Sequence, residues 1–216
     1  MNTAMCGRVL HKPVRTFVFL GDSITDCGHL WDDDPRCLGQ GYVREIADAL
    51  SDPSCCLINL GQDGFTSADV LRLLQRDGLP RQKDCISLLI GVNDLSVGYY
   101  ADSSWIPDRL AANIREILSL IRHSHGGKLI IMEPFLFPLP AEHRRLFPLL
   151  ARERQILQAA AGQYDGLYLP LQNALNEAAS GQGERQITPD GIHLTGAGNR
   201  IVAAEWLKAY SAAFFS

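Results

Sequence analysis

The sequence of 216 residues predicts an α/β fold, a three-layer α/β/α sandwich around a mostly parallel, five-stranded sheet. Short runs of β-branched, aromatic and aliphatic residues alternate along the chain with segments whose apolar residues recur at helical spacing. This alternation is typical of parallel strands joined by right-handed crossovers, with helices on both faces of the sheet. The length suits a single domain over residues 1–216, and we expect residues 1–15 to be a loosely packed N-terminal extension.

Five apolar runs account for the strands. The first, residues 16–20, is apolar or β-branched throughout and ends at Gly21, which predicts a strand buried on both faces. The predicted strands are residues 16–20, 55–59, 86–90, 129–132 and 167–169.

Helical spacing accounts for most of the remaining chain. The helix from residue 107 carries an apolar face, and Thr195 is a plausible N-terminal cap for the closing helix. Glu153 and Arg154 are interpreted as part of a solvated, charged helix face. The predicted helices are residues 42–50, 66–74, a long helix from residue 107, residues 144–161, residues 171–179 and the closing helix after Thr195.

Two long loops are predicted beside the strand ends. Residues 25–41 hold Trp31 and three consecutive aspartates, which we interpret as a solvated turn in preference to a metal site. The second loop holds Tyr99, Tyr100 and Trp105. Each of these aromatic residues is open to two interpretations, a platform for a sugar ring or an anchor packed on the core.

Composition excludes several classes of function. The net charge of −4 is spread along the chain, with no basic block to bind nucleic acid, and the apolar runs are too short to span a bilayer. Residues 1–15 lack the apolar core of a secretory signal, so we expect a cytoplasmic protein. The six cysteines include no C-x-x-C pair, which favours reduced, packed thiols.

Three strand ends carry side chains that complement one another chemically. Ser23 follows the first strand, Gly64 the second and Asn93 the third, all on the edge of the sheet where ligands bind in open α/β folds. Ser23 offers a hydroxyl, Gly64 an approachable backbone N–H and Asn93 an amide donor. Alone, Ser23 could equally be a helix cap; together the three residues favour a site for acyl transfer.

The base that such a site needs is supplied by Asp190-x-x-His193. At this separation Asp190 can accept a hydrogen bond from one imidazole nitrogen, leaving the other to take the Ser23 proton. Taken separately, Asp190 is a turn residue and His193 a surface histidine. In combination with the three strand ends, the catalytic interpretation is favoured.

These residues resemble the SGNH hydrolases, or GDSL esterases, in all four motif blocks of that family. The blocks are Gly21-Asp22-Ser23, Asn59 to Gly64, Gly91-Val92-Asn93-Asp94 and Asp190-Gly191-Ile192-His193. The resemblance implies a flavodoxin-like sheet, a catalytic triad of Ser23, His193 and Asp190, and an oxyanion hole from the backbone N–H groups of Ser23 and Gly64 with the Asn93 amide. It implies no metal and no organic cofactor.

Within the family, the chain is similar to intracellular acetylxylan esterases and related carbohydrate deacetylases. The similarity lies in residues 21–28 and 38–43, whereas residues 95–98 differ from the tryptophan-arginine pair of that subgroup. We therefore expect a serine esterase for short acyl groups, acting on a small-molecule or oligosaccharide ester. The alternatives are an acyltransferase or thioesterase with the same triad, or a non-catalytic carbohydrate-binding module. Residues 212–215 either contact a second subunit of a homo-oligomer or end the last helix against its own sheet; the second is favoured.

Overall fold

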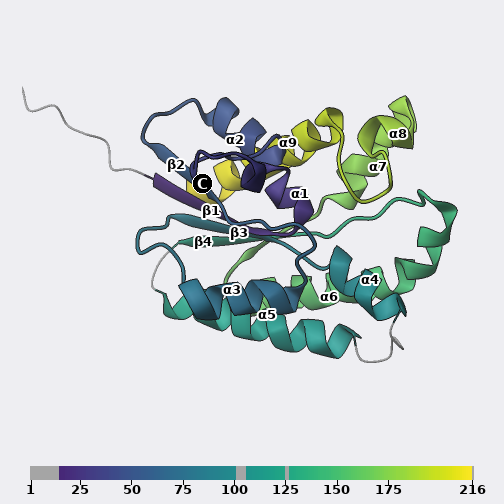
Figure 1. Ribbon diagram of the computed structural model, residues 1–216, viewed down its shortest axis with the longest axis horizontal. Coiled ribbons are helices and arrows are strands. Elements are labelled where there is room, and N and C mark those ends of the chain that lie inside the picture. The colour runs from purple at the N-terminus through teal and green to yellow at the C-terminus, as the bar shows by residue number, and fades with distance from the viewer. Residues whose placement is uncertain (1–14, 101–105, 125–126, 216) are drawn as a thin grey trace, which may run out of the picture.

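A five-stranded parallel sheet runs through the centre of the molecule, with helices on both faces (Figure 1). The strand order is β2-β1-β3-β4-β5, and each neighbouring pair is parallel. The strands are β1 (Arg15–Gly21), β2 (Cys55–Asn59), β3 (Cys85–Leu89), β4 (Lys128–Met132) and β5 (Leu167–Leu169). The predicted α/β/α sandwich is confirmed.

This computed structural model describes residues 15–100, 106–124 and 127–215. Most of the expected N-terminal extension and Trp105 lie outside the described residues. The helices are α1 (Ser23–Asp26), α2 (Tyr42–Leu50), α3 (Ser67–Asp77), α4 (Val92–Tyr100), α5 (Ile106–His123), α6 (Phe147–Gln163), α7 (Gln172–Gln182), α8 (Glu184–Ile187) and α9 (Gly196–Phe215). Short 3₁₀ segments, η1 (His29–Trp31) and η3 (Ala141–Leu146), precede α2 and α6.

Helices α1, α2, α7 and α9 cover one face of the sheet, and α3, α5 and α6 cover the other (Figure 1). Strand β1 is buried on both faces, as predicted: Phe17 and Phe19 belong to one core cluster, and Val18 and Leu20 to the other. Alternate residues of a strand point to opposite faces, so β1 ties the two layers together.

The closing helix is anchored to β1 through Trp206. Its ring lies 5.9 Å from Phe17 and 5.5 Å from Phe19, and its Nε1 donates to Ser87 Oγ at 2.8 Å. The indole N–H would be costly to bury without this acceptor. Because α9 begins at Gly196, three residues after His193, this packing also helps to position the segment that carries His193.

The prediction of a loop after the third strand is wrong in part. Residues Val92–Tyr100 form α4, which begins directly after β3. Val92 and Leu95 of this helix are buried in the core, with exposed fractions of 2 % and 0 %. Their burial stabilises a helix that local sequence preference does not indicate. The predicted loop over residues 25–41 likewise contains the last two residues of α1 and all of η1, and the short helix α8 was not predicted.

The predicted helix over residues 144–161 is confirmed but shifted. It is divided between η3 and α6, with Pro148 in the first turn of α6, where its missing N–H costs no hydrogen bond. Across the described ranges, no helix combines the length and apolar character needed to cross a membrane.

Candidate active site

Ser23 is the first residue of α1, immediately beyond the carboxyl end of β1. The side chain that caps this helix is Asp22, whose Oδ1 accepts from the Ile24 N–H at 3.0 Å. The Ser23 hydroxyl is therefore not used as the cap. Its Oγ lies 3.0 Å from Nε2 of His193, although the two residues are 170 positions apart in sequence.

His193 is held on its other side by Asp190. Its Nδ1 lies 2.6 Å from Asp190 Oδ2, and Asp190 Oδ1 accepts from the backbone N–H groups of Ile192 and His193 at 2.9 and 2.8 Å. Partial burial raises the pKa of Asp190, but the His193 hydrogen bond and these backbone donors outweigh it and hold the pKa below its usual value. The carboxylate thus stays ionised and orients the imidazole.

The turn between these residues rests on the loop after β4. Gly191 has φ of +93°, and a Cβ atom there would lie 2.3 Å from Leu139 O. Only glycine fits such a close approach in this conformation. Gly191 O accepts from the Phe137 N–H at 2.9 Å, and its N–H donates to Thr188 Oγ1 at 2.8 Å.

Gly64 and Asn93 lie on neighbouring segments. Gly64 is exposed with φ of +73°, and no atom lies within 4 Å of the position of a Cβ atom, so the space beside its Cα is open. Asn93, at the start of α4, donates from Nδ2 to Phe65 O at 2.9 Å. This contact uses one amide hydrogen, fixes the side chain next to the Gly64 segment and leaves the second hydrogen available.

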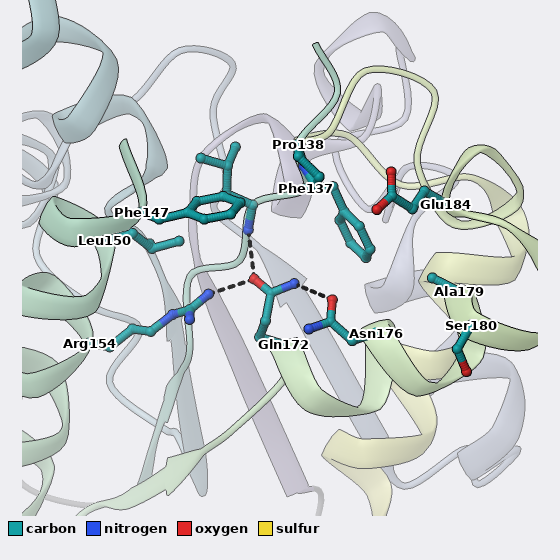
Figure 2. A pocket seen from close by; sticks show the side chains of 11 residues that line it. Phe137, Pro138, Phe147, Leu150, Arg154, Gln172, Asn176, Ala179, Ser180 and Glu184 are labelled. Carbon is teal, nitrogen blue, oxygen red and sulfur yellow. Dashed lines mark hydrogen bonds between the residues drawn. The ribbon is translucent and has the colours of Figure 1, made fainter. Parts of the chain in front are cut away.

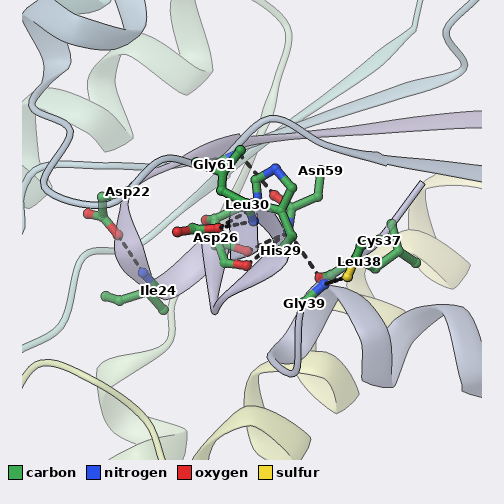
Figure 3. Close-up of polar contacts among 11 residues, drawn as sticks. Asp22, Ile24, Asp26, His29, Leu30, Cys37, Leu38, Gly39, Asn59 and Gly61 are labelled. Carbon is green, nitrogen blue, oxygen red and sulfur yellow. Dashed lines mark hydrogen bonds and ion pairs between the residues drawn. The ribbon is translucent and has the colours of Figure 1, made fainter. Parts of the chain in front are cut away.

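Asn59 joins the segment after β1, which carries Ser23, to the segment after β2, which carries Gly64 (Figure 3). At the end of β2, its Nδ2 donates to Thr25 O at 2.7 Å and Leu38 O at 3.0 Å, and its Oδ1 accepts from the Gly61 N–H at 2.9 Å. Gly61 packs so tightly against Thr25 that a Cβ atom would lie 2.7 Å from the Thr25 Cβ. Asn59 begins the second of the four motif blocks, but no role in the site was predicted for it; the signal for that role was a polar residue ending an otherwise apolar strand.

Two buried carboxyl groups, Asp22 and Glu153, and one partly buried carboxyl group, Asp94, lie near these residues. Asp22 is 1 % exposed, and burial raises its pKa to about 7. Asp94 accepts from the N–H and Oγ of Ser67 at 2.9 and 2.6 Å, but burial still raises its pKa. Glu153 on α6 is 0 % exposed, and burial, with repulsion from Asp94, raises its pKa to about 9. The prediction that Glu153 lies on a solvated face is therefore wrong.

The other residues considered in the sequence analysis, Trp31 and the aspartates at residues 32–34, form no hydrogen bond or ion pair with Ser23, His193 or Asp190 among the described residues. The three aspartates at residues 32–34 are exposed, and Asp34 Oδ1 lies 3.2 Å from the Arg36 guanidinium. Trp31 is 88 % exposed, so it is not a core anchor. Within the part of the chain that the structure describes, no group of three or more His, Cys, Asp or Glu side chains could hold a metal ion.

Comparison with known proteins adds independent information. The model of the GDSL-like lipase/acylhydrolase family matches residues 19–201. An acetylxylan esterase from Geobacillus stearothermophilus is 24 % identical over 202 residues, covering 88 % of this chain and 91 % of that protein.

Solved structures agree in fold. An acetyl-xylooligosaccharide esterase from Geobacillus matches with a TM-score of 0.79 and 24 % identity, covering 91 % of this chain and 94 % of that one. An α/β hydrolase enzyme from the metagenome of Lake Arreo, Spain, matches with a TM-score of 0.79 and 20 % identity, covering 92 % and 96 %.

Proposed function

The chain belongs to the GDSL-like lipase/acylhydrolase family and is a carboxylic ester hydrolase; from this premise we propose that it hydrolyses short acyl esters, most specifically acetyl esters of carbohydrates, through a triad of Ser23, His193 and Asp190. The observation that carries the proposal is the continuous hydrogen-bonded chain from Ser23 Oγ to His193 at 3.0 Å and from His193 to Asp190 at 2.6 Å. This is the geometry in which a hydroxyl becomes a nucleophile at neutral pH.

In the first half of the reaction, Ser23 Oγ attacks the ester carbonyl and His193 Nε2 takes its proton. Asp190 fixes the tautomer that leaves Nε2 unprotonated beforehand and stabilises the imidazolium afterwards. The negative charge that develops on the carbonyl oxygen is bound by the N–H groups of Ser23 and Gly64 and the unused amide hydrogen of Asn93. His193 then protonates the leaving alcohol, and an acyl-enzyme remains on Ser23.

In the second half, water replaces the alcohol. His193 removes a proton from the water, which attacks the acyl-enzyme carbonyl, and the same three donors bind the second tetrahedral oxyanion. The carboxylic acid leaves when His193 returns the proton to Ser23 Oγ. Each step uses groups that the sheet edge already holds in place.

Two features support a short acyl group and a bulky alcohol. The His193 and Asp190 side chains are 50 % and 48 % exposed, so an alcohol as large as a sugar has access to the triad. A cavity of about 530 Å³ between α6 and α7 is large enough for a long acyl chain, but neither Ser23 nor His193 lines it. The relatives named as acetylxylan or acetyl-xylooligosaccharide esterases support the acetyl group.

The test is hydrolysis of p-nitrophenyl esters from acetate to octanoate by the wild type and Ser23→Ala, with Ser211→Ala, an exposed serine on α9, as the matched control. We expect activity on acetate that falls with chain length, disappears in Ser23→Ala and persists in Ser211→Ala. Release of acetate from acetylated xylo-oligosaccharides then tests whether the alcohol part of the substrate is a carbohydrate. Activity that peaks at longer chains contradicts the short-acyl proposal, and ester hydrolysis that survives in Ser23→Ala contradicts the triad.

We also propose that residues 1–216 form one domain in a cytoplasmic protein. The two ends of the described chain pack together, with Arg15 Nη1 donating to Tyr210 OH at 2.8 Å, which supports a single domain. The five cysteines of the described residues are free thiols, which suits a reducing compartment. Unchanged stability after treatment with a thiol reductant is the expected result; a large loss would contradict reduced cysteines.

A further inference from the structure

A cavity lies beside the loop that follows β4, and the same loop contacts the Asp190–His193 turn through the Phe137 N–H. The cavity of about 530 Å³ is enclosed by that loop and by α6, α7 and α8 (Figure 2). Its size suits a small organic molecule. None of the residues assigned above to the triad or the oxyanion hole lines it.

One wall of the cavity is a polar array with fixed orientation (Figure 2). Gln172 Oε1 accepts from the Leu136 N–H at 3.0 Å and from Arg154 Nη2 at 2.6 Å. The Gln172 amide nitrogen donates to Asn176 Oδ1 at 2.9 Å. Gln172 Oε1 thus accepts two hydrogen bonds and Asn176 Oδ1 one, so the array still offers N–H donors on Arg154, Gln172 and Asn176 together with one acceptor lone pair on Asn176.

Arg154 brings positive charge to the cavity wall, where it forms an ion pair with Glu133. Its Nε donates to Pro134 O at 2.9 Å and lies 3.4 Å from Glu133 Oε1. The other oxygen of Glu133 is engaged, accepting from the N–H groups of Leu171 and Gln172 at 2.8 Å each. These contacts leave Nη1 for a ligand, and burial lowers the pKa of Arg154, so an added anion would stabilise its charge.

The apolar part of the lining comes from the β4 exit loop and from the same helix as Arg154, α6 (Figure 2). Phe137 is 1 % exposed and Leu150 2 % exposed, while Phe147 is 37 % exposed at the edge of the cavity. Glu184 lies on the side away from Arg154, where its carboxylate disfavours a second negative charge (Figure 2). From this combination we propose that the cavity binds a small monocarboxylate with an apolar body, its carboxylate on the Arg154–Asn176 array and its apolar part against Phe137 and Phe147.

The proposed ligand would lie against a residue that supports the catalytic turn. The Phe137 ring lines the cavity, while its N–H donates to Gly191 O at 2.9 Å and its carbonyl lies 3.1 Å from His143 Nδ1. A bound acid therefore acts on the position of His193 without occupying the active site. This effect on catalysis rests on the proposed function, in which His193 is the base. A carboxylic acid is also the class of product that an ester hydrolase releases.

The test is isothermal titration calorimetry with benzoate at constant ionic strength, compared with benzyl alcohol and terephthalate. The matched variants are Asn176→Asp, which puts a negative charge in the array, and Asn173→Asp, the same change at an exposed position of α7 outside the cavity. We expect saturable benzoate binding with one site per chain, at least tenfold weaker in Asn176→Asp and unchanged within twofold in Asn173→Asp. Benzyl alcohol and terephthalate should each bind at least tenfold more weakly than benzoate.

Benzoate binding that is absent, or equal in the two variants, would overturn the site. Because calorimetry needs no turnover, this result is independent of whether the esterase proposal holds. The second readout is hydrolysis of p-nitrophenyl acetate, in which we expect saturating benzoate to change kcat at least twofold with KM unchanged, and Asn176→Asp to remove the response. Purely competitive inhibition would place the acid in the active site and contradict the inference.

Discussion

The carboxyl group of Glu153 lies directly behind Gly91, with Oε2 3.0 Å from the position that a Cβ atom of residue 91 would occupy. Gly91 has φ of +132° and begins the segment that carries Asn93. Neither Glu153 oxygen has a hydrogen-bond partner among the described residues. The strand end that presents Asn93 is thus backed by a buried acid, which a pKa of about 9 keeps neutral at physiological pH.

This burial makes stability depend on pH. The folded-state pKa of Glu153 lies above the unfolded value of 4.5, so the folded state binds more protons between these two values and stability falls as pH rises from 4.5 to about 9. In Glu153→Gln we expect this loss, at most about 1.4 kcal/mol per pH unit, to disappear. Urea unfolding at pH 5 and pH 8 measures it, with Glu177→Gln, an exposed position on α7, as the control. Parallel pH dependence in wild type and Glu153→Gln would contradict the assignment.

Alanine substitutions at Gly64 and Gly78 distinguish an effect on kcat from an effect on the free energy of unfolding. Gly64 and Gly78 have φ of +73° and +71°, and neither has an atom within 4 Å of a Cβ position. Alanine at either site should cost about 1–3 kcal/mol of unfolding free energy, because both backbones have a positive φ. Only Gly64→Ala should also reduce kcat, by about 10-fold or more, since its methyl group would enter the space beside the proposed oxyanion donors. Equal kcat values for the two variants would exclude Gly64 from the oxyanion hole.

Asp190→Asn tests the orientation of the imidazole. An amide can donate to His193 Nδ1 and thereby stabilise the wrong tautomer, so kcat should fall by about 10²–10⁴ with little change in KM. Asp48→Asn, at an exposed position of α2, is the control and should leave kcat unchanged. Steady-state kinetics on p-nitrophenyl acetate provides the measurement. A fall of less than threefold in Asp190→Asn would show that Asp190 does not support the base.

Asn59→Asp tests the connection between the loops. The carboxylate cannot donate to Thr25 O and Leu38 O, which leaves two carbonyls facing a negative charge. Each buried carbonyl left without its donor costs about 1–3 kcal/mol, so urea unfolding should show a loss of several kcal/mol. The same change at exposed Asn173 should cost less than about 0.5 kcal/mol. Similar stabilities of the two variants would contradict a structural role for Asn59.

Much of the fold could be predicted because a buried strand or helix needs apolar residues at a regular spacing within a short stretch of sequence. The predicted bounds of β2, α2 and β5 are those of the structure, since each is a short periodic or apolar run ended by polar, glycine or proline residues. Helix α4 could not be predicted in the same way. It contains Gly98 and two tyrosines, and it is burial of Val92 and Leu95 that holds its N-terminal half.

The sequence by itself determined the alternation of strands and helices, the family, and the residue types at the edge of the sheet. These follow from hydrophobic period and from short motifs, which are properties of neighbouring residues. Only the tertiary structure decided that Asp22 caps α1 while Ser23 Oγ lies 3.0 Å from His193, that Glu153 is buried behind Gly91, and that Arg154 faces a cavity. Each of these relationships depends on contacts between residues that are distant in sequence. Which of them meet is set by the packing of helices on both faces of the sheet.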